Sequence, residues 1–426
     1  MSTETIFALS SGRPPAAVSV IRISGPHAHA AGRQLAGRLP EARSAALRTL
    51  RAGSGEILDD ALILRFDAPA SSTGEDIVEL QCHGGRAVVD AILEALSRID
   101  GLRPAEPGEF TRRAFENGRI DLTEAEGLAD LIEAETETQR KAALTMAEGG
   151  LRRQVEDWQQ RVLQLSARAE AAIDYVDDDD VATDLQLQQD STLLAAELGD
   201  WLERPRIEPL KDGVRVVVAG PPNVGKSSLI NAIAGEDKAI VTDVPGTTRD
   251  HIEVPLALAG LPIVLTDTAG LRETDDRVEA IGIGRSRSLL DQADILLWLG
   301  EPGEAPEHPR AILVHSRADL PTRALVPEGS VPVSSMTGAG IRELLDRVRE
   351  LSASFVPGEN ALALNRRQAA HLADARVSIR SAAETGDLVI AAEQLRNARL
   401  AFDRLTGRAS VEEVLDALFG RFCLGK

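Results

Sequence analysis

One stretch constrains the fold of this chain more than any other: Gly220-Pro221-Pro222-Asn223-Val224-Gly225-Lys226-Ser227. It matches GxxxxGKS/T, the pattern of a loop whose backbone N–H groups cradle phosphates at a helix N-terminus. The β-branched residues 214–219 before it predict a buried strand, and the apolar spacing in 228–234 predicts the helix that follows. A glycine-rich turn that binds nothing is the alternative, but the strand and the helix on either side favour a nucleotide-binding domain.

Two later stretches indicate that the nucleotide is GTP. Asp267-Thr268-Ala269-Gly270 follows the apolar run 263–266, so that Asp267 at a strand end could hold the water shell of Mg²⁺ while Ser227 ligates the ion. Between the two motifs lies Gly246-Thr247-Thr248-Arg249-Asp250, in which Thr248 could close on Mg²⁺ only when the γ-phosphate is present. Three motifs in this order predict a GTPase with a switch.

The residue after the second motif is Leu271, where many GTPases carry a glutamine that orients the attacking water. Catalytic help must therefore come from elsewhere. Asn223, beside the Pro-Gly-Thr-Thr switch, suggests a bound monovalent cation in the place of an arginine finger. Glu279 is a candidate for positioning the water, and a solvated carboxylate at a helix start is an equally good interpretation of it.

Composition and charge narrow the class of protein. The chain has 426 residues, enough for about three domains, with 43% hydrophobic and 27% charged residues, as in a soluble globular protein. No apolar run approaches a membrane span and no signal-peptide pattern opens the chain, so that we expect no membrane partner. Two cysteines far apart, Cys82 and Cys423, favour a reduced cytoplasm. The net charge of −20 argues against broad nucleic-acid binding by this chain alone.

The N-terminal part has a mixed α/β pattern. Residues 17–24, 61–66 and 77–82 predict strands, and 86–97 predict a helix. Alternation places Arg22 on one face of its strand with Val18 and Val20, and places Glu79 and Gln81 opposite Val78, Leu80 and Cys82. Arg22 and Glu79 could belong to a small-ligand pocket, or they could form a surface ion pair. The His83-Gly84-Gly85 stretch is more typical of a strand-to-helix turn than of a metal site.

Helical patterns flank the nucleotide-binding domain on both sides. They run from 122 to about 211 and resume after Pro357, and one seam repeats at steps of three and four: Val155, Trp158, Val162, Leu165, Ala169 and Ala172. We therefore expect α/β plus all-α architecture, with a Ras-like P-loop domain inserted into a helical one. The expected boundaries are 1–118 for an N-terminal α+β domain, 119–212 and 353–426 for the helical domain, and 213–352 for the nucleotide-binding domain.

The chain resembles one family, the tRNA-modifying GTPase MnmE, also called TrmE, over essentially its whole length. The resemblance rests on the motifs above and on more specific ones: Ser72-Thr73-Gly74-Glu75-Asp76, Glu79-Leu80-Gln81, Pro107-Gly108-Glu109-Phe110-Thr111-Arg112-Arg113-Ala114-Phe115, Ile120-Asp121-Leu122-Thr123-Glu124-Ala125-Glu126 and the ending Cys423-Leu424-Gly425-Lys426.

The resemblance implies an activity and partners. With the FAD-binding protein MnmG, the family adds an aminomethyl or carboxymethylaminomethyl group to carbon 5 of the wobble uridine of certain tRNAs. The carbon would come from 5-formyl- or methylene-tetrahydrofolate bound by the N-terminal domain. A homodimer formed through the N-terminal domains, a heterotetramer with MnmG, and activation by K⁺ are likewise implied.

The resemblance also assigns roles to single residues. Folate would contact Arg22, Glu79, Arg119 and Lys426. Mg²⁺ would be held by Ser227 and Thr248, and K⁺ by Asn223, Thr242, Val244 and Thr247. Glu279 falls on the family's catalytic glutamate. The expected GTP-binding residues are Asn223, Val224, Gly225, Lys226, Ser227, Ser228, Thr242, Asp243, Val244, Pro245, Gly246, Thr247, Thr248, Asp267, Thr268, Ala269, Gly270, Ser316, Arg317, Ala318, Asp319, Ser334, Ser335 and Met336.

Two positions depart from the family pattern. Ser316-Arg317-Ala318-Asp319 stands where the family generally has Asn-Lys-x-Asp for guanine. Asp319 can still accept hydrogen bonds from the guanine ring and its amine, but Ser316 cannot replace the asparagine amide. We therefore predict weaker guanine affinity with specificity retained. Arg119 stands where the family usually has lysine, and the two side chains are not interchangeable.

Other functions remain open at this stage. A regulatory GTPase acting in ribosome assembly would need neither an Arg22/Glu79 pocket nor the C-terminal tail, and a helical scaffold with a vestigial nucleotide domain would not need intact Lys226 and Ser227. Cys423 is a candidate nucleophile toward uridine carbon 6, although a thiol on an exposed tail is usually incidental.

Overall fold

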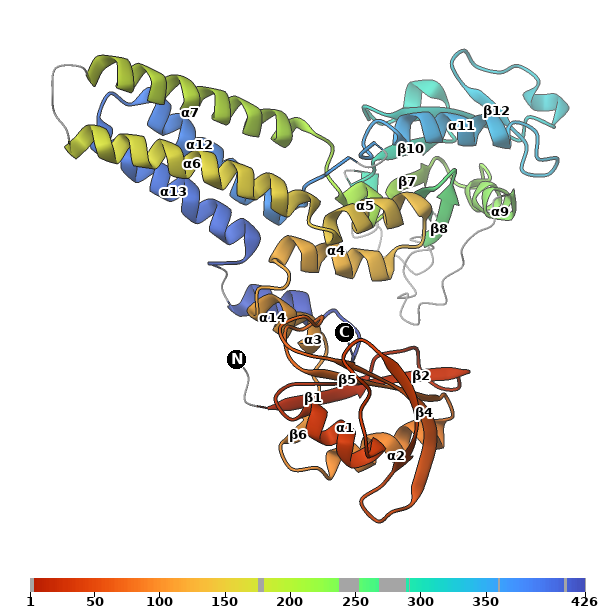
Figure 1. The fold of residues 1–426 in the computed structure, drawn as a ribbon. Helices are drawn as coiled ribbons and strands as arrows, with labels where there is room; N and C mark the ends of the chain where they lie inside the picture. Colours follow the sequence, from red (N-terminus) through yellow and green to blue (C-terminus); the bar gives the residue numbers. More distant parts are fainter. Residues whose placement is uncertain are drawn as a thin grey trace, which may run out of the picture. The chain divides into compact units, whose positions relative to one another are not determined.

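The computed structural model describes residues 4–174, 180–236, 253–267, 289–290, 292–358, 361–409 and 412–425. The chain divides into two compact units. The first comprises residues 1–129, 147–161 and 399–426, and the second comprises 130–146 and 162–398. Each unit is described by itself below (Figure 1).

A six-stranded sheet forms the N-terminal part of the first unit, with strand order β3-β4-β5-β2-β1-β6. Neighbouring strands are antiparallel except β1 and β6, which are parallel. The strands are β1 Thr5–Leu9, β2 Val18–Ser24, β3 Ala45–Arg51, β4 Ile57–Phe66, β5 Ile77–His83 and β6 Leu102–Pro104.

Helices α1 (Ala28–Ala36) and α2 (Arg86–Ser97) cover one face of this sheet (Figure 1). Their apolar residues pack in one core with the inward side chains of β2, β4 and β5, which include Ile21, Ile63 and Leu80. The alternation expected in β5 is confirmed, because Val78, Leu80 and Cys82 are buried while Glu79 and Gln81 lie on the other face. The predicted helix 86–97 is also confirmed, and His83 to Gly85 connect β5 to it.

The rest of the first unit is helical. It contains α3 (Glu109–Glu116), most of α4 (Leu122–Glu133), the first half of α6 (Gly150–Asp174), the end of α13 (Leu388–Thr406) and α14 (Glu412–Phe419). A cluster of Leu122, Ala125, Leu415, Phe419 and Phe422 joins α4 to α14 and to the C-terminal tail. The capping box expected for the last helix includes Ser410 and Val411, which lie outside the described residues.

The second unit contains another six-stranded sheet, with strand order β12-β11-β10-β7-β9-β8. All neighbours are parallel except β8 and β9. The strands are β7 Val214–Ala219, β8 Glu253–Leu258, β9 Leu261–Asp267, β10 Ile295–Trp298, β11 Ala311–Ser316 and β12 Val331–Val333. Helices α8 (Glu208–Lys211), α9 (Lys226–Glu236) and α11 (Ile341–Ser352) pack around this sheet, and short 3₁₀ turns occupy Pro302–Glu304 and Pro321–Arg323.

Long helices make up the remainder of this unit. They are α7 (Asp180–Glu203), α12 (Arg366–Glu384) and the parts of α6 and α13 that belong to it, together with α5 (Glu137–Ala147). The predicted seam of α6 is confirmed, since Val155, Trp158, Val162, Leu165, Ala169 and Ala172 are all buried. In the first unit, Trp158 stacks on Phe402 of α13 with ring centroids 6.0 Å apart. Within the part of the chain that is described, we find no helix combining the length and the apolar character needed to cross a membrane.

Candidate functional site

The P-loop lies where the sequence placed it, between β7 and α9 at the carboxyl edge of the parallel sheet. Gly220 has φ of 152°, and a side chain there would come within 3.2 Å of Leu299 on the neighbouring chain segment after β10. Gly225 (φ 100°) and Asn223 (φ 61°) also hold positive φ angles. The loop therefore turns tightly before α9 begins at Lys226, and its amides gather at the helix N-terminus, where anions bind.

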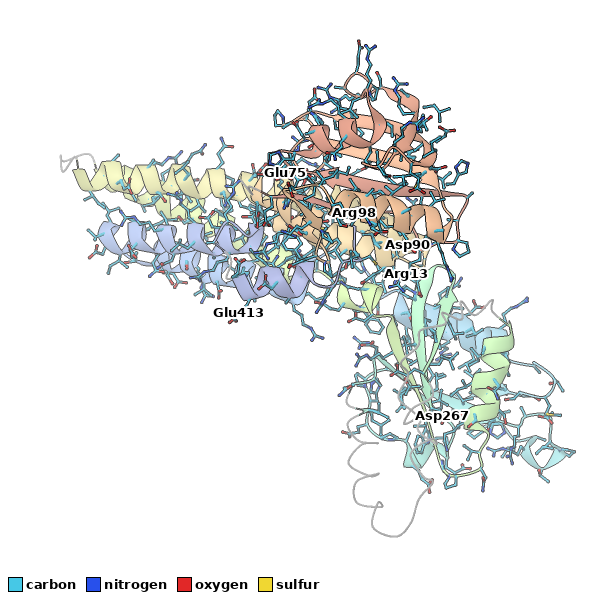
Figure 2. All side chains as sticks on the ribbon, turned by 90° about the horizontal axis from the view of Figure 1, so that it is seen from below. Arg13, Glu75, Asp90, Arg98, Asp267 and Glu413 are labelled. Carbon is cyan, nitrogen blue, oxygen red and sulfur yellow. The ribbon has the colours of Figure 1, made fainter. Side chains whose placement is uncertain are left out.

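Three polar side chains meet at this edge. The Lys226 ammonium group donates to the carbonyl oxygens of Gly220 and Pro221 at 3.0 and 2.9 Å, and the residue is only 7% exposed. Ser227 Oγ donates to Asp267 Oδ2 at 2.6 Å. Asp267 is the last residue of β9 and is buried at the sheet edge labelled in Figure 2. A hydroxyl and a carboxylate in contact beside a lysine form a donor set suited to Mg²⁺ and phosphate.

The candidate base-binding loop follows β11 and touches the P-loop. Ser316 Oγ donates to the carbonyl oxygen of Val224 at 2.8 Å, and the Arg317 guanidinium donates to that of Asn223 at 2.7 Å. The Ala318 N–H donates to the carbonyl oxygen of Val333 at 3.1 Å, which joins this loop to β12. Asp319 is exposed.

A second candidate base-binding segment comes directly after β12. Ser334 is buried, and its hydroxyl accepts from the Thr337 N–H at 3.2 Å. Met336 lies on the surface of the loop. The described GTP-binding candidates thus gather at the carboxyl ends of β7, β9, β11 and β12, four of the five parallel strands of the sheet, where ligands of such sheets bind.

Several predicted site residues lie outside the described residues. They are Thr242, Asp243, Val244, Pro245, Gly246, Thr247, Thr248, Thr268, Ala269, Gly270, Glu279 and Lys426.

The first unit contains a cavity of about 370 Å³ beside the uncovered face of its sheet. Its lining includes two predicted folate residues, Arg22 and Arg119, and residues that were given no role in the sequence, such as Thr73, Phe110 and Thr111. The full lining is Arg22, Ser71, Ser72, Thr73, Phe110, Thr111, Ala114, Arg119, Ile120 and Leu128. The volume is in the range of small-molecule sites.

Arg22 and Glu79 form an ion pair next to this cavity. Arg22 Nε and its terminal nitrogen lie 2.9 and 2.8 Å from Glu79 Oε1, and both side chains are largely shielded from solvent. The Arg22 guanidinium also lies 5.6 Å from the centre of the Phe110 ring. The alternative of an ion pair is therefore confirmed, although the pair is largely shielded from solvent; of the two residues, Arg22 also lines the cavity.

A buried polar network holds the loop that forms the cavity wall. Ser24 Oγ lies 2.8 Å from Thr73 Oγ1 and donates to Glu75 Oε2 at 2.8 Å, and Glu75 in turn pairs with Arg113 of α3 at 3.1 Å. Gly74 has φ of 79°, and a side chain there would approach Arg119 Cγ to 3.2 Å. The Ser72–Asp76 motif is thus required for the shape of this wall, which no local sequence pattern revealed.

The C-terminal tail returns to the N-terminal sheet. Phe422 is buried in the cluster with Phe419, and Gly425 packs so closely on β1 that a Cβ would lie 2.1 Å from the carbonyl oxygen of Leu9. Leu9 pairs with Ile21 of β2, next to Arg22. The tail therefore ends near the strand that carries the predicted folate residue.

The two cysteines differ in environment. Cys82 is buried in the sheet core, and burial raises the pKa of its thiol, as expected of a core thiol. Cys423 is free and exposed on the tail. An exposed thiol is accessible to a substrate, whereas the Cys82 thiol is not.

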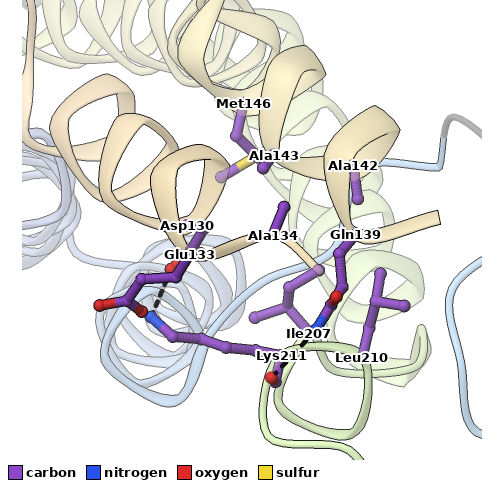
Figure 3. A pocket seen from close by; sticks show the side chains of 10 residues that line it. All are labelled: Asp130, Glu133, Ala134, Gln139, Ala142, Ala143, Met146, Ile207, Leu210 and Lys211. Atoms are coloured by element: carbon purple, nitrogen blue, oxygen red, sulfur yellow. Dashed lines mark hydrogen bonds and ion pairs between the residues drawn. The ribbon is translucent and has the colours of Figure 1, made fainter. Parts of the chain in front are cut away.

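A smaller cavity of about 50 Å³ lies in the second unit between α4, α5 and α8 (Figure 3). Lys211 forms an ion pair with Asp130 at its mouth, and Gln139 donates to the Lys211 carbonyl oxygen at 3.3 Å. Burial lowers the pKa of Lys211, but its hydrogen bond to Asp130 and the negative charges of Asp130, Glu133 and Asp212 together outweigh this effect, so that the pKa is raised. The cavity is too small for a nucleotide or a folate, and its position marks the junction that leads into β7.

Comparison with known proteins gives a consistent result. A family model described as "GTP-binding protein TrmE N-terminus" matches residues 5–119, and one described as "MnmE helical domain" matches residues 122–423. Proteins named tRNA modification GTPase MnmE are similar over nearly the full length. The protein from Erythrobacter litoralis is 53% identical (99% of this chain and 100% of that protein), and that from Rhizorhabdus wittichii is 52% identical (100% and 97%). The chain therefore belongs to the MnmE family of tRNA modification GTPases, also called TrmE.

Proposed function

We propose that this chain hydrolyses GTP and, with the FAD-binding protein MnmG, adds an aminomethyl or carboxymethylaminomethyl group to carbon 5 of the wobble uridine in certain tRNAs. The observation that carries the proposal is the arrangement of Lys226, Ser227 and Asp267 at the P-loop of a family member that also has a cavity beside Arg22 and Glu79. A nucleotide site and a second ligand site in one chain fit an enzyme better than a simple switch.

The nucleotide site would work as follows. Lys226 is held by two carbonyl oxygens of its own loop, so its ammonium group is already aimed at the space that phosphates would fill. The hydroxyl of Ser227 and the carboxylate of Asp267 hold each other, and both would turn to Mg²⁺, Ser227 directly and Asp267 through water.

K⁺ would be held by Asn223 with Thr242, Val244 and Thr247. Bound Mg²⁺ and K⁺ would supply positive charge against the phosphate oxygens during hydrolysis. We assign to Glu279 the positioning of the attacking water, in the absence of a glutamine at Leu271.

The cavity of the first unit would hold a tetrahydrofolate. The carboxylate of Glu79 can accept hydrogen bonds from the N–H groups of a pterin ring, and Phe110 offers an aromatic face. Arg22 orients Glu79 through their ion pair, and Arg119 at the cavity wall is a cation for the glutamate tail of the folate. Lys426 would add a second cation, because Gly425 before it packs on Leu9 beside this region.

The uncovered sheet face suggests how a homodimer forms. Leu47, Leu62, Gln81 and Val20 lie in register across four neighbouring strands on the face opposite α1 and α2, and Leu47 is 66% exposed. Leu47 and Leu62 are exposed apolar side chains on neighbouring strands of this row, and exposed apolar residues grouped on a sheet face are typical of a protein interface. We propose that a second copy covers this row. MnmG and tRNA would be further partners in the cytoplasm, and a basic surface on MnmG would offset the net charge of −20.

The test uses the full-length protein with MnmG, tRNA, methylene-tetrahydrofolate, GTP and either K⁺ or Na⁺, with the modified uridine measured by mass spectrometry. Ser227→Ala is expected to abolish both hydrolysis and modification. Glu79→Gln is expected to lower modification strongly at limiting folate while GTP turnover continues. If Glu79→Gln left modification intact, the alternative, a regulatory GTPase in ribosome assembly, would be favoured; equal hydrolysis in Na⁺ would refute the role of K⁺.

A further inference from the structure

A histidine lies between two carboxylates in the first unit. His29 is in the first turn of α1, and Asp67 and Asp76 lie in the segment that connects β4 to β5. His29 Nε2 lies 3.4 Å from Asp67 Oδ1, and His29 Nδ1 lies 3.3 Å from Asp76 Oδ2. One candidate ligand atom from each of the three residues lies within 4.8 Å of the other two. None of the three side chains lines the cavity beside Arg22.

Backbone hydrogen bonds fix the segment that carries the two carboxylates. Asp76 Oδ1 accepts from the Ala68 N–H at 2.9 Å, and the Asp76 carbonyl oxygen accepts from the Gly25 N–H at 3.0 Å, shortly before α1. The Asp67 carbonyl oxygen accepts from the Ala70 N–H at 2.9 Å. The fold therefore holds both carboxylates beside α1, and a ligand would not have to bring them there.

Both ring nitrogens of His29 face oxygen atoms, because Nε2 also lies 3.2 Å from the carbonyl oxygen of Phe66. A neutral imidazole carries one N–H group and one lone pair. If Nδ1–H donates to Asp76, the Nε2 lone pair is directed toward the oxygens of Phe66 and Asp67. In the other tautomer the Nδ1 lone pair is directed toward Asp76. In each case a lone pair faces oxygen, and a cation between them, a proton or a metal ion, relieves the repulsion.

The spacing at Nε2 favours a metal ion over a proton. A charged N–H group that donates to a carboxylate has a nitrogen–oxygen distance of about 2.7–2.9 Å. The distances from His29 Nε2 to Asp67 Oδ1 and to the Phe66 carbonyl oxygen are 3.4 and 3.2 Å. Two ligands bound tetrahedrally to zinc at about 2.0–2.1 Å lie about 3.3–3.4 Å from each other. The nitrogen is therefore spaced from both oxygens as ligands of one ion are.

Charge and access also suit a cation. Arg65 Nε and Nη2 donate to Asp67 Oδ1 and Oδ2 at 2.7 and 3.0 Å, but a carboxylate oxygen has two lone pairs, so Oδ1 keeps one for an ion. Two carboxylates against one guanidinium leave one negative charge around His29. The His29 side chain is 12% exposed, whereas Asp67 and Asp76 are 43% and 33% exposed. An ion can therefore enter from solvent and keep water as a further ligand.

We propose that His29 Nε2, Asp67 Oδ1 and the carbonyl oxygen of Phe66 bind one Zn²⁺, with water completing the coordination. Asp76 Oδ2 would then accept from the Nδ1–H, the contact that usually orients a metal-binding histidine. An imidazole nitrogen among oxygen donors suits zinc better than Mg²⁺ or Ca²⁺, which prefer oxygen ligands alone. The ion would fasten the start of α1 to the connection between β4 and β5, a structural role that is separate from GTP hydrolysis and from uridine modification.

Zinc binding is measured on the full chain by equilibrium dialysis and mass spectrometry of the metal. GDP and excess Mg²⁺ are present, so that the nucleotide site is filled. The wild type should bind one zinc ion per chain, and His29→Ala should lose it. Asp76→Asn keeps an acceptor for the Ala68 N–H and should bind zinc about 10- to 100-fold more weakly.

The matched control is His83→Ala. His83 Nδ1 also pairs with a carboxylate of the same domain, Asp59, at 2.8 Å, but among the described residues this pair belongs to no group of three candidate ligands. The control should bind zinc like the wild type. Zinc should also raise the melting temperature of the wild type and of His83→Ala, and it should leave that of His29→Ala unchanged, because a ligand stabilises only a protein that binds it.

The proposal is overturned if the wild type binds no zinc, or if His29→Ala retains it or is stabilised by it as much as the wild type. Melting in the presence of a chelator shows whether His29→Ala is folded. If it is not folded, Asp67→Asn decides the question, since asparagine keeps the shape of the side chain and removes its charge. Zinc affinity about tenfold below that of the wild type supports the site, and unchanged affinity refutes it.

Discussion

The substitution Glu79→Gln offers the sharpest test of the folate cavity. Glu79 keeps its shape as glutamine, and the amide oxygen can still accept from Arg22, so the fold around the cavity should survive. What is lost is the charge that would accept hydrogen bonds from a pterin. Hydrogen bonds to charged groups contribute about 1.5–3 kcal/mol, and about 1.4 kcal/mol corresponds to a factor of ten. The expected weakening is therefore about 10- to 100-fold.

The effect on stability should be much smaller than the effect on binding. The side chains of Arg22 and Glu79 are 24% and 16% exposed, so their pairing is partly screened and should contribute about 1 kcal/mol or less. Thermal unfolding of the ligand-free variant therefore serves as an internal check. A large drop in melting temperature would mean that the substitution disturbs the sheet rather than the site.

The measurement is isothermal titration calorimetry with 5-formyltetrahydrofolate. Asp67→Asn is the matched control, because Asp67 forms a comparable pair with Arg65 at 2.7 Å in the same domain but does not line the cavity. It should bind folate like the wild type. The reasoning would be refuted if Glu79→Gln bound as tightly as the wild type, or if Asp67→Asn lost as much affinity.

Three further predictions concern the tail, the thiols and a buried carboxyl. Gly425→Ala would place a Cβ against the Leu9 carbonyl at a φ of 92°, a strain of about 1–3 kcal/mol, so the tail should detach and folate affinity should fall about tenfold with GTP hydrolysis unchanged, as titration calorimetry would show. A thiol reagent should modify Cys423 in the native protein and Cys82 only after unfolding, since burial raises the pKa of Cys82; rapid native labelling at Cys82 would contradict this. Burial also raises the pKa of Asp121, although the Glu124 N–H and the Thr123 hydroxyl, which donate to its carboxylate, act in the opposite direction. The protonated Asp121 therefore contributes to the free energy of unfolding below the ordinary carboxyl pKa, and this contribution is lost as pH rises through the pKa of the folded state. Asp121→Asn should therefore gain melting temperature relative to the wild type at pH 7 and less so at pH 4, and the opposite trend would count against the burial argument.

The nucleotide-binding strands were predictable because central strands of a parallel sheet are buried on both faces and read as continuous apolar runs. Residues 214–219 form β7 with the predicted bounds, and Asp267 ends β9 as expected. The edge strand β8 was missed, since it is half-exposed and contains Pro255. The turn that joins β8 to β9 is Ala259-Gly260, and both residues have positive φ, as in a two-residue β-hairpin turn. In the sequence, only Gly260 could have indicated this turn.

Only those parts of the candidate sites that lie within a single sequence segment were predictable. The P-loop places Lys226 and Ser227 through local spacing, and alternation placed Arg22 on the correct face of β2. The cavity wall required three separate segments, around Thr73, Phe110 and Leu128, which the tertiary fold alone brings together. The hydrogen bond from Arg317 to the P-loop joins residues 94 positions apart. It depends on a left-handed backbone conformation at Arg317, which neither amino-acid composition nor hydrophobic periodicity indicates.

The junction around α5 shows how the nucleotide site can act on the helical part of the second unit. Strand β8 begins at Glu253, directly after the segment that contains the predicted switch residue Thr248, and its hairpin with β9 reaches α5: a Cβ on Gly260 would lie 3.2 Å from Thr138 Oγ1. The next residue of α5, Gln139, donates to the carbonyl oxygen of Lys211, the last residue of α8, which shortly precedes β7 and the P-loop. Helix α5 therefore lies against the turn between β8 and β9 on one side and contacts α8, shortly before β7, on the other. A displacement of the β8–β9 hairpin relative to α8 would therefore act on α5, because Thr138 leaves little room beside Gly260 and Gln139 is hydrogen-bonded to the backbone of Lys211.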